Sequence, residues 1–472
     1  MGYQDKYSGS YVVEAGWILA TTEGTADLFS RASMRVDDGR IAEVVAGPIK
    51  GDLPRVSLPD HLVMPGLISG HTHVASATPT RGLIEGGRSF SRPLKLVDAL
   101  SDEELDDLTA FNLAEILKAG CTTQVEMSLS LRQAESYVRV AGPWGARGFV
   151  GGMIPGTSRL DAIWFRDSDD ALFESEAETL AEIEANLVFG RRIANSHGGR
   201  MMPMMAPHAT DTHTPATMAA IVAAAGELGT GVHTHLSQRA AETDAVRRLY
   251  GGLTPTQWLD SLGAFEGPFF GAHMMALDWS VDPTILKSNG AVYAHCPSAG
   301  GAGGASQPYP EALAAGIATN VAIDTHSNDL IENVKLAVIA GKARAKLQQA
   351  HGVPVKAPTI WDAVGGATVV AADGLRRPDL GRLAPGARAD FIALDLSDWL
   401  VGAGASPPEP LNNLLYASGA AVTHVAIDGR FVVFDRALQT AEEEEVFERG
   451  GAVNRKIWQQ LVDEEWFSPT PR

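Results

Sequence analysis

Short apolar runs alternate with longer amphipathic stretches over residues 65–380, and this alternation constrains the fold more than any other feature of the sequence. Eight of the runs have the length and composition of buried strands, and the stretches between them carry apolar residues at helical spacing. In chain order the runs are VMPGLISG, TTQVEM, ARGFVGGMI, MMPMMAPH, TGVHTHL, PFFGAH, AVYAH and NVAID. Strand–helix alternation predicts a parallel sheet, and eight units predict a (β/α)₈ TIM barrel.

Short β-type runs flank the barrel region on both sides. Residues 1–64 and 381–436 each contain a few such runs, broken by Gly, Asp and Pro. Neither segment alone has enough strands to bury a core. We therefore expect the two segments to fold together as one small β-sandwich domain, and residues 437–472 to form a C-terminal helical tail.

Composition and charge exclude several classes of function. A hydrophobic content of 45% and a charged content of 20% are those of a globular protein. The formal net charge of −19 repels phosphate backbones and anionic lipid, so we expect no nucleic-acid or membrane partner. No apolar stretch is long enough for a membrane span, and the first residues lack a signal-peptide core. The chain has only two cysteines, so a disulfide framework is not expected. We therefore expect a cytoplasmic protein that acts on a small molecule.

Histidines gather at the C-terminal ends of the predicted strands. In a (β/α)₈ barrel these ends meet at the mouth where the chemistry takes place. Histidines placed for structural reasons alone have no cause to collect there. Six of the thirteen lie at or just beyond such ends, namely His71, His73, His208, His235, His273 and His295.

The segment His71-Thr72-His73 is the strongest single indication of a metal site. In an extended chain, residues i and i+2 point the same way, so both imidazoles can bind one metal. A second such pair, His233-Thr234-His235, ends the fifth strand, and we expect one of its histidines to be a ligand and the other to support the site. Asp324 ends the eighth strand and either supplies a carboxylate or caps the next helix. Three histidines and one aspartate suit a divalent cation such as zinc or ferrous iron.

Ordered motifs over nearly the whole chain resemble those of the amidohydrolase superfamily, in its branch of cytosine-deaminase-like and triazine-hydrolase-like enzymes. The motifs are VMPGLISGHTH, LAEILKAGCTTQVEM, APHATDTHTP, VHTHLSQ, GAHMMAL, GAVYAHCP, VAID and LGRLAPGARADFIALDL. The resemblance implies metal ligands at four positions, which are His71, His73, His235 and Asp324. It also implies that relatives commonly form dimers or larger assemblies, so we expect a homo-oligomer.

The same resemblance implies catalytic and substrate-binding roles. His273 matches a histidine that polarises the substrate and shuttles protons in members with one metal, and that binds the second metal in members with two. Members with two metals usually need a carboxylated lysine after the fourth strand, where this chain has Ala206-Pro207-His208. We therefore expect one divalent metal ion per subunit. The expected ion is Zn(II), and Fe(II) and Co(II) are the alternatives. His208 matches a histidine that contacts substrate in the related deaminases.

One position departs from the deaminase pattern. Deaminases of this branch carry a glutamate three residues after the strand-five histidine, and here that residue is Gln238. An amide forms hydrogen bonds but is no general acid or base, so ring deamination is disfavoured. With the motif SGHTHVASATPTRG, this substitution makes the chain similar to the phenylurea and molinate hydrolases.

Four further residues are candidates for substrate contact. His295 either contacts substrate or fills the top of the barrel. His326 and Asn328 follow Asp324 and offer an imidazole and an amide beside the metal. Arg81 lies shortly after the first metal-binding pair and either touches substrate or forms a surface ion pair.

The working hypothesis is hydrolysis of an N-substituted urea, carbamate or thiocarbamate by metal-activated water, with His273 and Asp324 as the catalytic residues. The alternative is an aminohydrolase or chlorohydrolase of a heterocycle such as a triazine, pyrimidine or purine. A third hypothesis, a non-catalytic scaffold, is disfavoured because all four ligand positions are filled.

Overall fold

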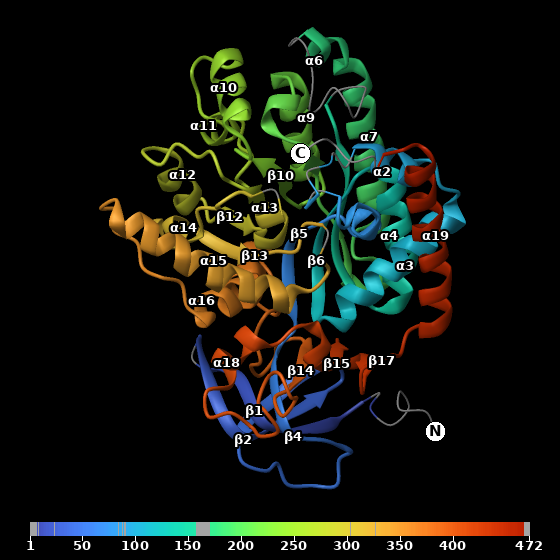
Figure 1. Cartoon of the computed structure of the whole chain (residues 1–472), viewed down its shortest axis with the longest axis vertical. Coiled ribbons are helices and arrows are strands. Elements are labelled where there is room, and N and C mark those ends of the chain that lie inside the picture. The colour runs from blue at the N-terminus through green and yellow to red at the C-terminus, as the bar shows by residue number, and fades with distance from the viewer. Residues whose placement is uncertain are drawn as a thin grey trace.

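Eight parallel strand positions form the predicted barrel in the computed structural model (Figure 1). One half contains β5 (Leu67–Thr72), β6 (Cys121–Ser128), β7 (Arg147–Ile154), β8 (Met201–Pro203) and β9 (Ala206–Pro207). The other half contains β10 (Val232–Leu236), β11 (Phe269–His273), β12 (Val292–His295) and β13 (Ala318–Val321). Single pairings of Thr72 with Asp324 and of Met205 with Val232 join the two halves. The structure describes the chain except residues 1–6, 8, 23, 84, 87, 89–90, 157–169, 303, 326 and 467–472.

The helices follow the strands as the sequence pattern predicts. Those of the barrel region are α2 (Ser91–Asp98), α3 (Asp102–Lys118), α4 (Leu131–Trp144), α6 (Asp170–Glu174), α7 (Glu176–Ile193), α8 (Ser196–Gly199), α9 (Pro215–Glu227), α10 (Ala240–Leu249), α11 (Pro255–Ser261), α12 (Asp282–Ser288), α13 (Pro297–Ala302), α14 (Tyr309–Ala315), α15 (Leu330–Ala350), α16 (Ile360–Gly365) and α17 (Ala371–Gly374). Local chemistry sets their ends. The Ser101 side chain accepts from the Glu104 N–H in a capping box that begins α3, and Gly145 ends α4 in the left-handed region at φ 84°.

Both ends of the chain contribute to a separate eight-stranded sheet below the barrel (Figure 1). Its strands are β1 (Tyr11–Thr22), β2 (Thr25–Asp37), β3 (Arg40–Ala46), β4 (Arg55–Pro65), β14 (Phe391–Asp395), β15 (Val422–Ile427), β16 (Arg430–Phe434) and β17 (Ala437–Leu438). The order is β17-β16-β15-β14-β4-β1-β2-β3, so β4 and β14 join the two contributions. The sheet curls into a sandwich. The curl brings the Tyr11 ring of β1 within 5.7 Å of the Phe431 ring of β16, although these strands are not neighbours in the sheet.

A buried ion cluster ties the sandwich to the bottom of the barrel. Arg147, at the start of β7, is 1% exposed. Its Nε lies 3.0 Å from Oδ2 of Asp390, and its second terminal nitrogen lies 2.8 Å from Oδ1 of Asp428. Asp390 precedes β14 and Asp428 lies in the turn between β15 and β16, so one side chain joins the two sheets.

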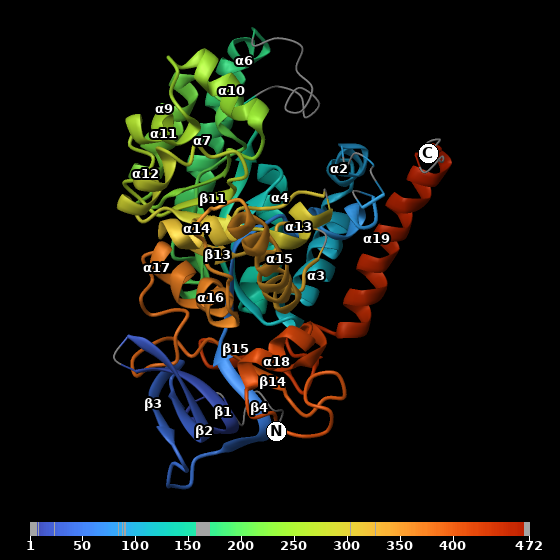
Figure 2. The same ribbon diagram turned by 60° about the vertical axis from the view of Figure 1, so that its left-hand side comes forward.

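The C-terminal helix α19 (Glu443–Asp463) packs along α3 on the outside of the barrel (Figure 2). Thr78 donates to the side-chain oxygen of Asn454, and Arg449 and Lys456 pair with acidic residues near the start of α3. The short helix α18 (Pro410–Asn413) lies between β14 and β15 in the chain. Among the helices in the described residues, none is both long enough and apolar enough to cross a membrane.

Candidate metal centre

Imidazole, carboxylate and thiol groups from five strand ends meet at the mouth of the barrel. They form three overlapping sets in which the ligand atoms lie within 4.8 Å of one another. The first set is His71, His73 and Asp324; the second is His71, His235 and His273; the third is His273, Cys296 and Asp324. All six residues are buried. The four predicted metal ligands therefore fall in two sets that share His71, although they are far apart in the chain.

Hydrogen bonds at Nδ1 turn three imidazoles toward the centre. Nδ1 of His73 lies 2.6 Å from the Met127 carbonyl, and Nδ1 of His235 lies 2.6 Å from the His208 carbonyl. Because a carbonyl only accepts, each Nδ1 carries the proton and each Nε2 keeps its lone pair for a cation. Nδ1 of His71 lies 2.6 Å from Nε2 of His233, which places His233 behind His71 as seen from the centre.

The fit of these residues to a metal rests on one polar atom in particular. Nε2 of His71 is buried and has no hydrogen-bond partner in the described part of the chain. A buried nitrogen of this kind is costly unless something else satisfies it. Together with the nearby imidazoles and carboxylate, it fits a divalent cation such as zinc.

Burial sets the charge state of the centre. It lowers the pKa of His273 to about 3, with a smaller contribution from the neighbouring His73. Burial, followed by repulsion between neighbouring imidazoles, also lowers the pKa values of His71 and His235 well below the usual range. These rings are therefore neutral at neutral pH, the form that binds metal. Burial raises the pKa of the Asp324 carboxyl to about 7.

Two residues of the centre have strained backbones. His273 has φ 76° and Asp324 has φ 64°, both in the left-handed region that non-glycine residues avoid. The Asp324 N–H donates to the His71 carbonyl, and the His73 N–H donates to the Asp324 carbonyl. The closing strands thus hold Asp324 in this conformation, as is common for strained residues at functional sites.

The sequence profile of the Amidohydrolase family matches residues 62–432, which include every element of the centre. The chain belongs to the amidohydrolase family. It is therefore a hydrolase that acts on carbon–nitrogen bonds other than peptide bonds. A relative from Desulfitobacterium hafniense, 28% identical over 89% of this chain and 92% of its own, is named 5-methylthioadenosine/S-adenosylhomocysteine deaminase. Further relatives, 26–30% identical, carry that name or a numbered form of it.

Solved structures share the fold of this amidohydrolase. An adenosine deaminase from Xanthomonas campestris with bound zinc has a TM-score of 0.77 at 23% identity, over 95% of this chain and 98% of its own. An atrazine chlorohydrolase from Arthrobacter aurescens TC1, complexed with zinc, has a TM-score of 0.79 at 17% identity, over 94% of this chain and all of its own. At these identities the likeness establishes the fold, and the bound zinc agrees with the donor set found here.

The other residues predicted to contact substrate lie in two different places, one near the metal centre and one in a separate cavity. His208 and His295 are buried near the centre, with the His208 ring 5.0 Å from the His235 ring and the His295 ring stacked on Tyr309. Burial lowers the pKa of each of these imidazoles to about 3. Gln238 is half-buried beyond β10. The prediction for His326 falls outside the described residues.

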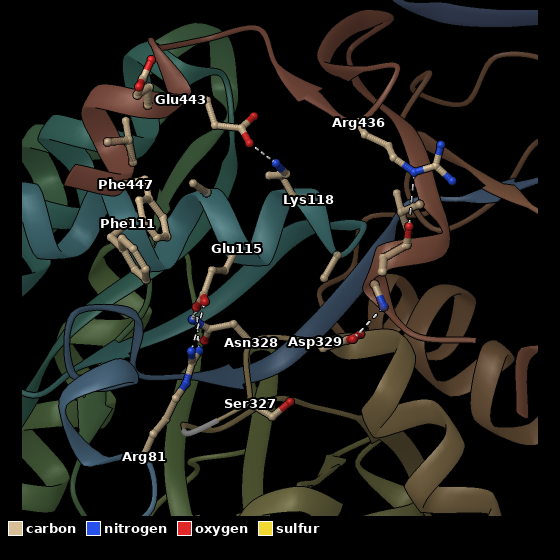
Figure 3. Close-up of a pocket in the computed structure, with 17 residues that line it drawn as sticks. Arg81, Phe111, Glu115, Lys118, Ser327, Asn328, Asp329, Arg436, Glu443 and Phe447 are labelled. Atoms are coloured by element: carbon tan, nitrogen blue, oxygen red, sulfur yellow. Dashed lines mark hydrogen bonds and ion pairs between the residues drawn. The ribbon is translucent and has the colours of Figure 1, made fainter. Parts of the chain in front are cut away.

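Arg81 and Asn328 lie elsewhere, in a side cavity between α3 and α19 (Figure 3). The cavity has a volume of about 1160 Å³, and its lining residues include none of the six residues of the centre. Arg81 makes two contacts with the Glu115 carboxylate at 2.6 and 3.0 Å, and Asn328 donates to the same carboxylate at 2.8 Å. For Arg81 the structure therefore contains the ion pair, the alternative to substrate contact, because its side chain reaches the face of α3.

Two buried glutamates fix the loops that carry the centre. Glu126 of β6 accepts from the Thr72 hydroxyl at 2.6 Å and from the Val74 N–H at 3.2 Å, and so holds the backbone on both sides of His73. Glu242 of α10 accepts from the N–H of Ser237 at 3.1 Å and of Gln238 at 2.7 Å. Glu242 was not among the residues predicted from the sequence, and the signal that could have found it is a glutamate in the first helical turn after the strand-five loop.

His213, a buried histidine outside the three sets of candidate metal ligands, makes stability depend on pH. His213 bonds through Nε2 to the Ile154 carbonyl, and burial lowers its pKa from 6.5 to about 4. As the pH falls from 6.5 to 4, the unfolded chain binds the proton first, so about 3 kcal/mol of stability is lost. His213→Gln should remove this part of the acid sensitivity in urea unfolding measured over that pH range. The exposed His351→Gln is the control, and equal acid sensitivity in both variants would contradict the prediction.

Proposed function

We propose that this amidohydrolase removes an exocyclic amino group from a heterocycle by hydrolysis, with purine nucleosides that carry a 5′-thioether as the first substrate class. The observation that carries the proposal is the name of its relatives, deaminases aligned over 81–93% of this chain. These relatives favour ring deamination. The sequence, because of Gln238, had favoured the cleavage of a urea, carbamate or thiocarbamate instead.

His71, His73, His235 and Asp324 would hold one divalent cation per subunit, with zinc first and ferrous iron or cobalt as alternatives. A bound cation of this kind lowers the pKa of water from about 15.7 towards ~7, which supplies a nucleophile at neutral pH. The imidazoles are kept neutral by burial and are aimed by their Nδ1 contacts, so they can receive a cation with little rearrangement.

Proton movement falls to Asp324 and His273 in this proposal. Oδ2 of Asp324 lies 3.8 Å from Nε2 of His273, so both groups face the same space. Asp324 accepts a proton from the attacking water and delivers it to the departing amine. His273 donates a hydrogen bond to the substrate and positions the ring. Gln238 contributes hydrogen bonds only, because its amide does not titrate.

A substrate panel with the metal-loaded protein tests the proposal. It compares 5′-methylthioadenosine, adenosine, guanine and an aminotriazine with a phenylurea and a thiocarbamate, and it measures ammonia, aniline and thiol release. We expect ammonia from at least one ring amine and no cleavage of the urea or thiocarbamate. Release of aniline or thiol without ammonia from any ring amine would overturn the proposal and restore the acyl-cleavage hypothesis.

A further inference from the structure

The Asp324 carboxylate faces two different sets of donors. Its Oδ1 lies 3.4 Å from Nε2 of His73 and 3.6 Å from Nε2 of His71. Its Oδ2 lies 3.8 Å from Nε2 of His273. These distances exceed hydrogen-bond length but match the separation of two ligands around one cation. A carboxylate in this position can bind one cation through each oxygen.

The Cys296 thiol is the third donor on the side of the Asp324 Oδ2 atom, together with that oxygen and His273. Cys296 follows β12, is fully buried, and offers Sγ within 4.8 Å of ligand atoms of both His273 and Asp324. Its Sγ lies 3.5 Å from the Ala294 carbonyl, a weak contact that leaves the sulfur available. Imidazole, thiolate and carboxylate from three adjacent strand ends are a suitable ligand set for zinc and other thiophilic divalent cations.

We propose that His273, Cys296 and Asp324 form a second, weaker cation site, whose occupation inhibits the enzyme. The inference rests on the metal centre of the proposed function. On binding, the Cys296 S–H bond breaks, a sulfur–metal bond forms, and the proton leaves to solvent without any change of oxidation state. Occupation takes His273 away from the substrate, because its Nε2 becomes a ligand. The site is weaker because it has three protein ligands, shares Asp324 with the first site, and places a second positive charge close to the first.

The alternative is that Cys296 is only a packing residue. Its side chain lies in a small cluster with Ala272, Ala294 and Ala322, and a buried thiol often serves as a small apolar group. Packing alone requires no nearby carboxylate and imidazole. The two explanations differ in what they predict when metal is in excess.

Titration of the chelator-treated full-length protein with cobalt(II) distinguishes them. We expect the first equivalent to bind without sulfur-to-metal charge-transfer absorption in the near ultraviolet, because its ligands are nitrogen and oxygen. The second equivalent should produce that absorption. Cys296→Ser and Cys296→Ala should lose the absorption and the second equivalent, whereas Cys121→Ala, the matched control at the start of β6, should keep both. In a parallel assay with zinc, excess metal should lower turnover in the Cys121 variant but not in the Cys296 variants.

Several outcomes would overturn the proposal. A single equivalent without charge-transfer absorption in excess cobalt would show that Cys296 is a packing residue. Absorption that appears with the first equivalent would place Cys296 in the primary site. Absorption that persists in both Cys296 variants would assign it to another sulfur. Failure of the metal centre itself gives a different result, which is no tight equivalent at all in the wild-type protein.

Discussion

Replacing Asp324 by asparagine should lower kcat by about 10²–10⁴-fold, the usual contribution of a positioned general acid or base. The Asp324 carboxylate lies between the imidazoles of His71 and His73 on one side and His273 on the other, where it can accept a proton from water and deliver it to the leaving group. An asparagine keeps one oxygen for the cation but accepts no proton. The measurement is kcat with the best substrate of the panel, with metal content determined by plasma mass spectrometry.

The control for this variant is Asp244→Asn, which makes the same chemical change at an exposed position of α10. We expect the control to keep the wild-type kcat and both proteins to retain metal. A near-normal kcat for Asp324→Asn would remove Asp324 from proton transfer. A loss of metal in proportion to the loss of activity would limit its role to binding.

The largest effect on stability is expected at Arg147. Arg147→Met should lower the free energy of unfolding by about 3–5 kcal/mol, because it leaves Asp390 without its buried partner and removes one of the partners of Asp428. Methionine fills much of the same volume, so the decrease in the free energy of unfolding is caused by the uncompensated charges rather than by a cavity. Urea unfolding of the metal-loaded protein, followed by circular dichroism, measures the change.

A surface ion pair provides the comparison for Arg147. Arg139 of α4 pairs with Asp106 of α3 at 2.7 Å, and both side chains are about one-third or more exposed. Arg139→Met should cost no more than about 1 kcal/mol, as is typical of exposed pairs. Equal losses for the two variants would show that the buried cluster contributes no more than a surface contact.

The barrel and the cluster of histidines at its mouth could be predicted because both leave local signals. Buried parallel strands are continuous apolar runs, and a ligand at a strand end stands next to its run in the sequence. His71, His73, Asp324 and the pair of His233 and His235 were therefore visible as candidates without any knowledge of loops, and the choice of His235 rested on the family resemblance. The fourth strand was found as one run, but the structure divides it into β8 and β9 around Met204 and Met205.

The remaining features depend on contacts between distant segments. Arg147 meets its partners in loops next to strands in the last part of the chain, and no local pattern marks it as buried. The proximity of Cys296 to His273 depends on how the ends of β11 and β12 are staggered. The path of the Arg81 side chain depends on a loop conformation that leads it to Glu115. Residue type alone specifies none of these.

The shared sheet at the bottom of the molecule has a consequence for biosynthesis. Strand β4 pairs with β14, which the ribosome makes only after the whole barrel. At roughly 5–20 residues per second, this interval lasts on the order of tens of seconds. Throughout it, one edge of β4 presents unpaired backbone groups, which are a template for association with other chains. In the folded enzyme β14 covers this edge of β4. Only the nascent chain therefore needs protection by chaperones at this edge.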